Sequence, residues 1–186
     1  MMTRRTTREE NQKPAKAGHG FSLIELLVVV AIILIIAAIA IPNFLRSRMA
    51  ANEASAAENV RSITTAAVVY STTWDNGYPP SLGALGGTSN PATCDKAILL
   101  DPNLTNPPNQ TSGYTFAYMP QGPTVTAGGG CTLPGYNAYV ATAVPTIAAV
   151  TGTRSFCSTQ PGTIHVAVGG GPIASQAACN ALPALQ

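Results

Sequence analysis

The apolar positions of this chain form three different patterns, and the first is the most pronounced. From Phe21 to Ile41 every residue is apolar except Ser22 and Glu25. This run of 21 residues, at about 1.5 Å of helix per residue, is long enough to cross the hydrocarbon core of a bilayer. Its second part is apolar on every face, which a small domain could hardly cover. We therefore predict a membrane-spanning helix.

The second pattern is amphipathic and follows directly after Pro42. Apolar residues recur at spacings of 4, 3, 4, 3 and 4, which places them in one stripe along a helix. The helical pattern stops near Asp75-Asn76-Gly77, so we predict one long helix over residues 21–74. Pro42 lacks a backbone N–H and is expected to kink that helix. The stripe consists of Ala56, Val60, Ile63, Ala67, Tyr70 and Trp74.

Charged residues of this second half are predicted to lie mostly away from the stripe. They are Arg46, Arg48, Glu53, Glu58 and Arg61. A pair between Glu53 and one of the two preceding arginines, in the same chain or a neighbouring one, is an alternative. Solvated charges are the interpretation that we favour.

The third pattern, short runs of alternating residues, occupies the C-terminal part. Residues 75–112 are rich in Gly, Pro, Asn, Ser and Thr and indicate a long loop, with at most a short helix at Ala97–Leu100. Strand-like runs follow, and we expect an antiparallel meander of three or four strands whose apolar face covers the helical stripe. The predicted fold class is therefore α+β. The runs are 114–119, 136–144, 154–158 and 164–168.

The charge is distributed unevenly between the N-terminal leader and the rest of the chain. Residues 1–20 hold five basic and two acidic residues, a net charge of +3, whereas the remainder holds five basic and six acidic residues. A basic segment before a membrane span predicts a cytoplasmic N-terminus, so residues after Pro42 would lie across the membrane. The remainder, with a net charge of −1, offers no basic patch that would indicate nucleic-acid binding.

Four cysteines, Cys94, Cys131, Cys157 and Cys179, all follow the apolar run. In an oxidising compartment an even number of cysteines predicts two disulfides. Three pairings are open, and we favour the sequential one. In it, the Cys157–Cys179 disulfide would fix the C-terminal tail and stabilise the fold by about 3 kcal/mol. A zinc site is disfavoured, because no CxxC occurs and His165 is the one histidine beyond the leader.

The residue inventory also argues against an enzyme. From Pro102 to Gln186 there is no Asp or Glu and a single histidine, so no carboxylate pair, triad or nucleophile with a nearby base can be assembled there. The sequence contains no CxxCH motif, so covalent haem attachment is not indicated. We therefore expect no catalytic residue, no metal and no cofactor.

The residues around the start of the apolar run point to a family. The sequence Gly20-Phe21-Ser22-Leu23-Ile24-Glu25, followed by the apolar run and Pro42-Asn43-Phe44, closely resembles the type III signal segment of type IV pilins and pseudopilins. The resemblance implies that a prepilin peptidase cuts between Gly20 and Phe21 and methylates the new amino group of Phe21. It divides the chain into a cleaved cytoplasmic leader (1–20), a long helix (21–74, with a transmembrane or filament-core segment 21–41), and a disulfide-linked loop and sheet (75–186).

The same resemblance implies how such a subunit is used. It would wait in the inner membrane as a single-pass protein and then be extracted by an assembly ATPase and a platform protein into a helical homopolymer, an extracellular pilus. Glu25 would pair with the α-amino group of Phe21 on a neighbouring subunit, since an unpaired carboxylate in a water-free core is costly. A carboxylate that merely reaches the headgroups is the alternative. Pro42 either kinks the helix or marks where it melts in the filament.

Three functions remain open from the sequence. The first is a pilus subunit, and the second is a minor pseudopilin of a type II secretion system. A major pseudopilin is disfavoured, because its calcium site needs acidic ligands and none follows Asp101. The third is a single-pass anchored module that never polymerises.

Overall fold

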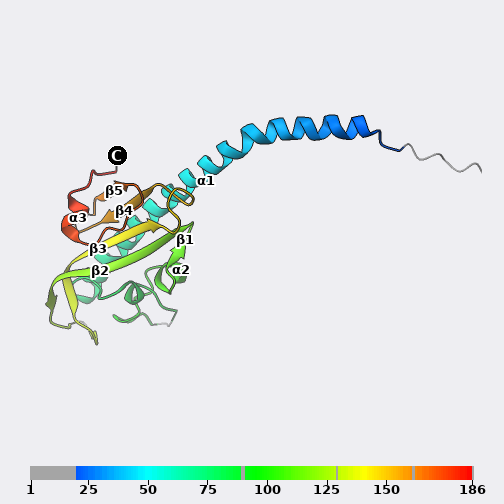
Figure 1. Ribbon diagram of the computed structural model, residues 1–186. Helices are drawn as coiled ribbons and strands as arrows, with labels where there is room; N and C mark the ends of the chain where they lie inside the picture. Colours follow the sequence, from blue (N-terminus) through cyan, green and yellow to red (C-terminus); the bar gives the residue numbers. More distant parts are fainter. Residues whose placement is uncertain (1–19, 89–90, 129, 161, 186) are drawn as a thin grey trace, which may run out of the picture. The chain divides into compact units, whose positions relative to one another are not determined.

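The computed structural model describes residues 20–88, 91–128, 130–160 and 162–185, in two units that divide after Pro42. Residues 1–19 of the predicted leader lie outside the described residues. The elements, all but η1 labelled in Figure 1, are α1 (Leu23–Trp74), η1 (Leu82–Leu85), α2 (Pro102–Thr105), β1 (Gln110–Thr111), β2 (Tyr114–Val125), β3 (Gly135–Pro145), β4 (Arg154–Ser158), β5 (Ile164–Val168) and α3 (Gln176–Asn180).

Helix α1 confirms the long helix predicted from the two apolar patterns. It contains 52 residues, and its α-helical geometry continues through Pro42. It ends before Asp75, which has a φ of 46°. A residue in this left-handed conformation commonly terminates a helix.

The five strands form one antiparallel sheet in the order β1-β2-β3-β4-β5, which confirms the predicted meander. Phe116 in β2 is opposite Ala143 in β3, and Phe156 in β4 is opposite Val166 in β5. Two features were not predicted. Strand β1 has two residues, too few for a pattern, and β2 continues to Val125 past a register shift near Gly122.

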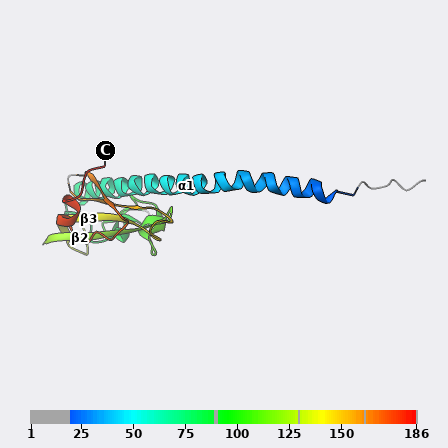
Figure 2. The same cartoon turned by 45° about the horizontal axis from the view of Figure 1, so that its top comes forward.

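The core lies between the sheet and the second half of α1, as the stripe predicted. Figure 2 shows this half of the helix along the sheet. Period-two alternation in β2 buries Tyr114, Phe116 and Tyr118, while Tyr139 of β3 and Phe156 of β4 join them. The helical residues of the same cluster include Ala56, Val60, Ile63, Ala67 and Tyr70, with Trp74 partly buried against it.

The short helix predicted at Ala97–Leu100 is wrong. The N–H of Ala97 donates to Ala84 O and that of Leu99 to Leu85 O. These backbone donors thus bond to η1 and not to carbonyl groups of a helix of their own. Helical turns lie instead at η1 and at α2. In α2, Asp101 caps the helix by accepting a hydrogen bond from Asn103 N at 2.7 Å, and proline occupies the first position.

Glu53 clamps α1 to the sheet, which corrects its predicted position away from the stripe. Its side chain is buried, and Oε2 accepts from Nε of Arg154 at 2.7 Å. Oε1 accepts from the backbone N and the hydroxyl of Thr153, at 2.7 and 2.9 Å. Burial alone would raise the pKa of Glu53, but the donors from Thr153 and Arg154 outweigh it and hold the pKa below its ordinary value.

Both disulfides are present, in the sequential pairing. Cys94 is bonded to Cys131, and Cys157 of β4 to Cys179 of α3. Beyond α3 the chain returns to the outer edge of the sheet. There Val166 N donates to Pro183 O at 2.9 Å and Leu185 N to Ile164 O at 2.7 Å, so the tail covers β5.

Candidate functional site

The first half of α1 exposes the most apolar surface of the described chain. We call residues 21–41 the exposed apolar segment. Its large side chains range from 45% exposed at Val30 to 86% at Phe21. Within the described ranges, α1 is the one helix that is long and apolar enough to cross a membrane. Because apolar surface costs about 25 cal/mol per Å² in water, this segment requires a cover of lipid or of other protein.

The N-terminal end of this segment has a defined local structure. The backbone N–H of Ser22 donates to Glu25 Oε2 at 2.9 Å, and Leu26 N donates to Ser22 O at 3.2 Å. Ser22 is thus the N-cap and Glu25 the third helical residue, the spacing of a capping box. A carboxylate in the first turn is also favoured by the helix dipole, by about 0.3–1 kcal/mol.

The helix-dipole role of Glu25 follows from its place in the first turn, but its capping contact with Ser22 was not predicted from the sequence. The Ser-x-x-Glu spacing of Ser22 and Glu25 was the signal that could have revealed it. The same carboxylate borders an apolar groove lined by Phe21, Ile24 and Val28. In the described part of the chain Ser22 is its hydrogen-bond donor, through Oε2. No described residue donates a hydrogen bond to its other oxygen, Oε1.

The structure gathers three of the predicted site residues at one end of the segment. Gly20 and Phe21 precede the helix and are exposed, so the peptide bond between them is accessible. Glu25 lies in the turn that follows. Pro42 lies at the other end, 17 residues after Glu25 and therefore about 25 Å further along the helix axis.

The other predicted site residues, the four cysteines, belong to the second unit, after Pro42. In residues 20–185, apart from the gaps named above, no group of three or more His, Cys, Asp or Glu side chains is placed to hold a metal ion.

Comparison with known proteins is informative for the N-terminal part. Residues 16–41 match the model of the prokaryotic N-terminal methylation motif. Over 49 residues, 26% of this chain, the sequence is 51% identical to the type IV major pilin protein PilA of Myxococcus xanthus. The match spans 22% of that relative's length. No solved structure matches the chain significantly. The resemblance to type IV pilins and pseudopilins is confirmed for this segment.

Proposed function

We propose that this chain is a structural subunit of a type IV pilus, matured by a prepilin peptidase and polymerised through its exposed apolar segment. The methylation motif and the likeness to a major pilin support this proposal. The observation that carries it is the combination of an accessible Gly20-Phe21 junction with an apolar helical segment that no other part of the described chain covers.

The exposed apolar segment suits two successive environments. In the inner membrane, lipid tails cover it, and the basic leader keeps the N-terminus in the cytoplasm. In a filament, the same side chains on neighbouring copies replace the lipid. The assembly ATPase and the platform protein would drive this exchange, and the second unit would end outside the cell.

Cleavage changes the electrostatics around Glu25. It creates a cationic amino group on Phe21, and methylation leaves that nitrogen charged. In a filament core without water, an unpaired carboxylate is expensive, so a neighbour whose Phe21 amino group meets Glu25 is favoured over one in another axial register. The capping contact to Ser22 uses Oε2 and leaves Oε1 for this pair.

The experiment that tests the proposal is shearing surface filaments from cells and sequencing their dominant subunit by mass spectrometry. We expect this chain, beginning with N-methylphenylalanine at Phe21. An intact Met1 on the mature protein would contradict the proposal and favour a non-polymerising anchored module. Recovery only in trace amounts beside another subunit would favour a minor pilin or a minor pseudopilin.

Two substitutions separate the capping role of Glu25 from its pairing role. Glu25→Gln still accepts from the Ser22 N–H but loses the charge, whereas Glu25→Ala loses both. If pairing governs assembly, both variants are cleaved and inserted yet yield few filaments. Glu58→Gln is the matched control, because Glu58 is exposed on the second half of α1. Normal filament abundance in Glu25→Gln would reject the pairing and leave the cap as the role of Glu25.

A further inference from the structure

The two disulfides differ in their access to solvent. Cys157 and Cys179 are both 0% exposed. Cys94 is 3% exposed, but Cys131 is partly exposed, in a segment whose neighbours Gly130 and Thr132 are exposed. A Cβ built at Gly130 would meet no described atom within 4 Å apart from its chain neighbours, so the backbone next to Cys131 faces open space.

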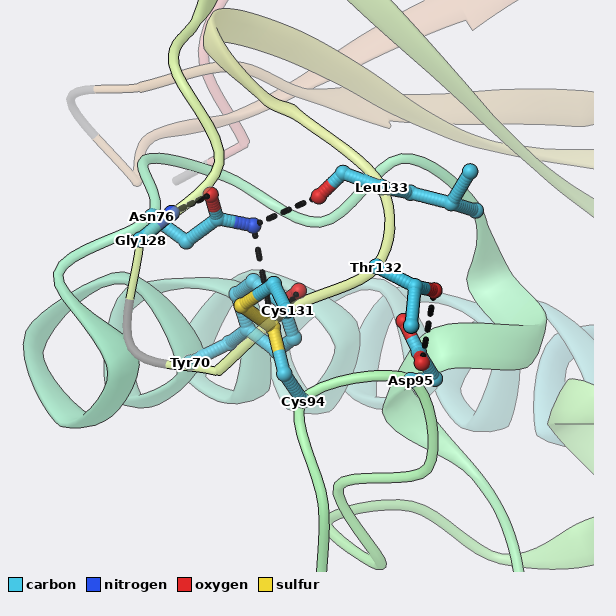
Figure 3. Close-up of a disulfide and its surroundings, with 8 residues drawn as sticks. All are labelled: Tyr70, Asn76, Cys94, Asp95, Gly128, Cys131, Thr132 and Leu133. Atoms are coloured by element: carbon cyan, nitrogen blue, oxygen red, sulfur yellow. Dashed lines mark hydrogen bonds between the residues drawn. A yellow bond between two sulfur atoms is a disulfide. The ribbon is translucent and has the colours of Figure 1, made fainter.

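The environment of the Cys94–Cys131 bond is also asymmetric. The hydroxyl of Tyr70 lies 2.8 Å from Cys94 Sγ, and Asn76 Nδ2 lies 3.6 Å from the same sulfur (Figure 3). A disulfide sulfur carries no proton, so Tyr70 is the donor. Burial raises the pKa of Tyr70, which keeps its hydroxyl protonated and able to donate. Both donors converge on the buried sulfur, and the accessible sulfur is the other one.

We propose that the Cys94–Cys131 disulfide is a thiol-exchange site for small thiols, with Cys131 as the attacked sulfur and Cys94 as the leaving group. A thiolate forms a new sulfur–sulfur bond to Cys131 Sγ while the Cys94–Cys131 bond breaks. The electron pair leaves on Cys94 Sγ, where the donors from Tyr70 and Asn76 stabilise the thiolate. A faster-leaving thiolate accelerates exchange. A second equivalent of the small thiol then frees Cys131, is itself oxidised to a disulfide, and leaves two reduced cysteines.

The surrounding contacts allow this exchange without loss of the fold. Asn76 is fully buried, and its amide accepts from Gly128 N and donates to Leu133 O, both at 3.1 Å. Thr132 donates to Asp95 at 2.8 Å. The segment that carries Cys131 is therefore held on both sides by hydrogen bonds as well as by the disulfide, and we expect these bonds to keep it in place when the disulfide opens. This site is independent of the pilus proposal.

The test is exchange on the full chain in detergent micelles, with reduced glutathione as the small thiol. Samples are quenched with acid at short times, free thiols are alkylated, and peptides are mapped by mass spectrometry. We expect glutathione on Cys131, a free thiol at Cys94, and an intact Cys157–Cys179 bond. Glutathione first on Cys94, or earlier opening of Cys157–Cys179, would overturn the proposal.

A pair of conservative substitutions tests the role of the donor. Tyr70→Phe keeps the ring but removes the hydroxyl, and should slow the exchange about three- to tenfold, since it destabilises the leaving thiolate. Tyr139→Phe is the matched control, because Tyr139 is equally buried and its hydroxyl, which lies near Thr64, makes no hydrogen bond to the disulfide. Equal rates in the two variants would overturn the role of Tyr70. The mapping on the unaltered chain stands on its own if either variant misfolds.

Discussion

The two halves of α1 are one continuous helix, yet the apolar side chains of the first half are exposed and those of the second half are largely buried. Residues 23–42 are more apolar and are almost entirely exposed, whereas the second half buries a stripe from Glu53 to Tyr70 against the sheet. The difference is one of pattern. The second half confines its apolar residues to one face, for which the same chain supplies a partner surface, while the first half is apolar all round. The most apolar part of the described chain, the exposed apolar segment, is thus the part that the described chain leaves in contact with its surroundings.

Under the proposed function, this contrast predicts that stability and assembly depend on different halves of α1. Substitutions in the buried stripe should change the free energy of unfolding of the second unit. Substitutions in the exposed apolar segment should change insertion and assembly and leave that free energy alone. The predictions below test this separation, beginning with the largest effect.

The largest expected effects are losses of stability, the first at Glu53, whose carboxylate is buried while the side chain of its partner Arg154 is 41% exposed. Glu53→Ala removes three charge-assisted hydrogen bonds at once and should lower the free energy of unfolding by about 2–4 kcal/mol, a loss limited by the access of water to the freed donors. Urea titration in detergent, followed by the fluorescence of Trp74, measures this loss. Glu58→Ala, which breaks the exposed pair with Arg61, should change the midpoint little. Equal effects would show that burial of Glu53 is not what matters.

A matched pair of isoleucines compares the two halves directly. Ile63→Ala removes a side chain that is 0% exposed, and should cost about 2–5 kcal/mol through lost burial and a residual cavity. Ile33→Ala, at a side chain that is 58% exposed, should leave the same urea midpoint unchanged. A comparable loss at Ile33 would contradict the division of roles.

A charge in the exposed apolar segment should impair membrane insertion without changing the stability of the second unit. Ile33→Lys should disfavour membrane insertion by about 2.5–3.5 kcal/mol, because it puts a cation near the bilayer centre. Carbonate extraction of membranes measures the inserted fraction. The urea midpoint of the second unit should stay that of the unaltered chain, and a shifted midpoint would count against the separation.

Acid should weaken the clamp at Glu53. Its folded pKa lies below the ordinary value of 4.5, so its contribution to stability is complete above pH 4.5 and is lost as the pH falls through the folded pKa. Urea midpoints measured from pH 7 down to pH 3 should decrease at the acid end. Glu53→Gln should flatten that decrease, and an identical acid profile in this variant would refute the assignment.

The smallest expected effect is at Tyr139. Its hydroxyl is buried near that of Thr64 but forms no well-aligned hydrogen bond within the described ranges, so removing it relieves a desolvation cost. Tyr139→Phe should therefore raise the free energy of unfolding slightly, by at most about 1 kcal/mol. A clear loss of stability would indicate a partner for this hydroxyl, such as a buried water.

The sequence predicted those elements whose buried face follows from the local spacing of apolar residues. The stripe from Ala56 to Trp74 and the alternation in 114–119 each predicted an element and its buried face, because one helix or strand sets that spacing. The pairing of Glu53 with Arg154 spans 101 residues, and no local pattern records it. The one available signal was that Glu53 lies three residues before Ala56, on the same face.

The short elements were not predicted, for a related reason. Strand β1, with two residues, and the turns η1 and α2 are fixed by tertiary hydrogen bonds and caps, which outweigh the weak propensities of a few residues. Glu25 stood out in the sequence as an unusual carboxylate, but its contact with Ser22, three residues earlier, was not predicted.

The C-terminal tail along β5 has a consequence for crowding. An uncovered outer strand invites pairing with the same strand of another molecule, and many copies held side by side would multiply that risk. Here the tail already bonds two outward groups of β5, Val166 N and Ile164 O, through Pro183 O and Leu185 N. Neighbouring molecules are thereby less able to join their sheets through β5, and an array of such molecules would keep each sheet separate.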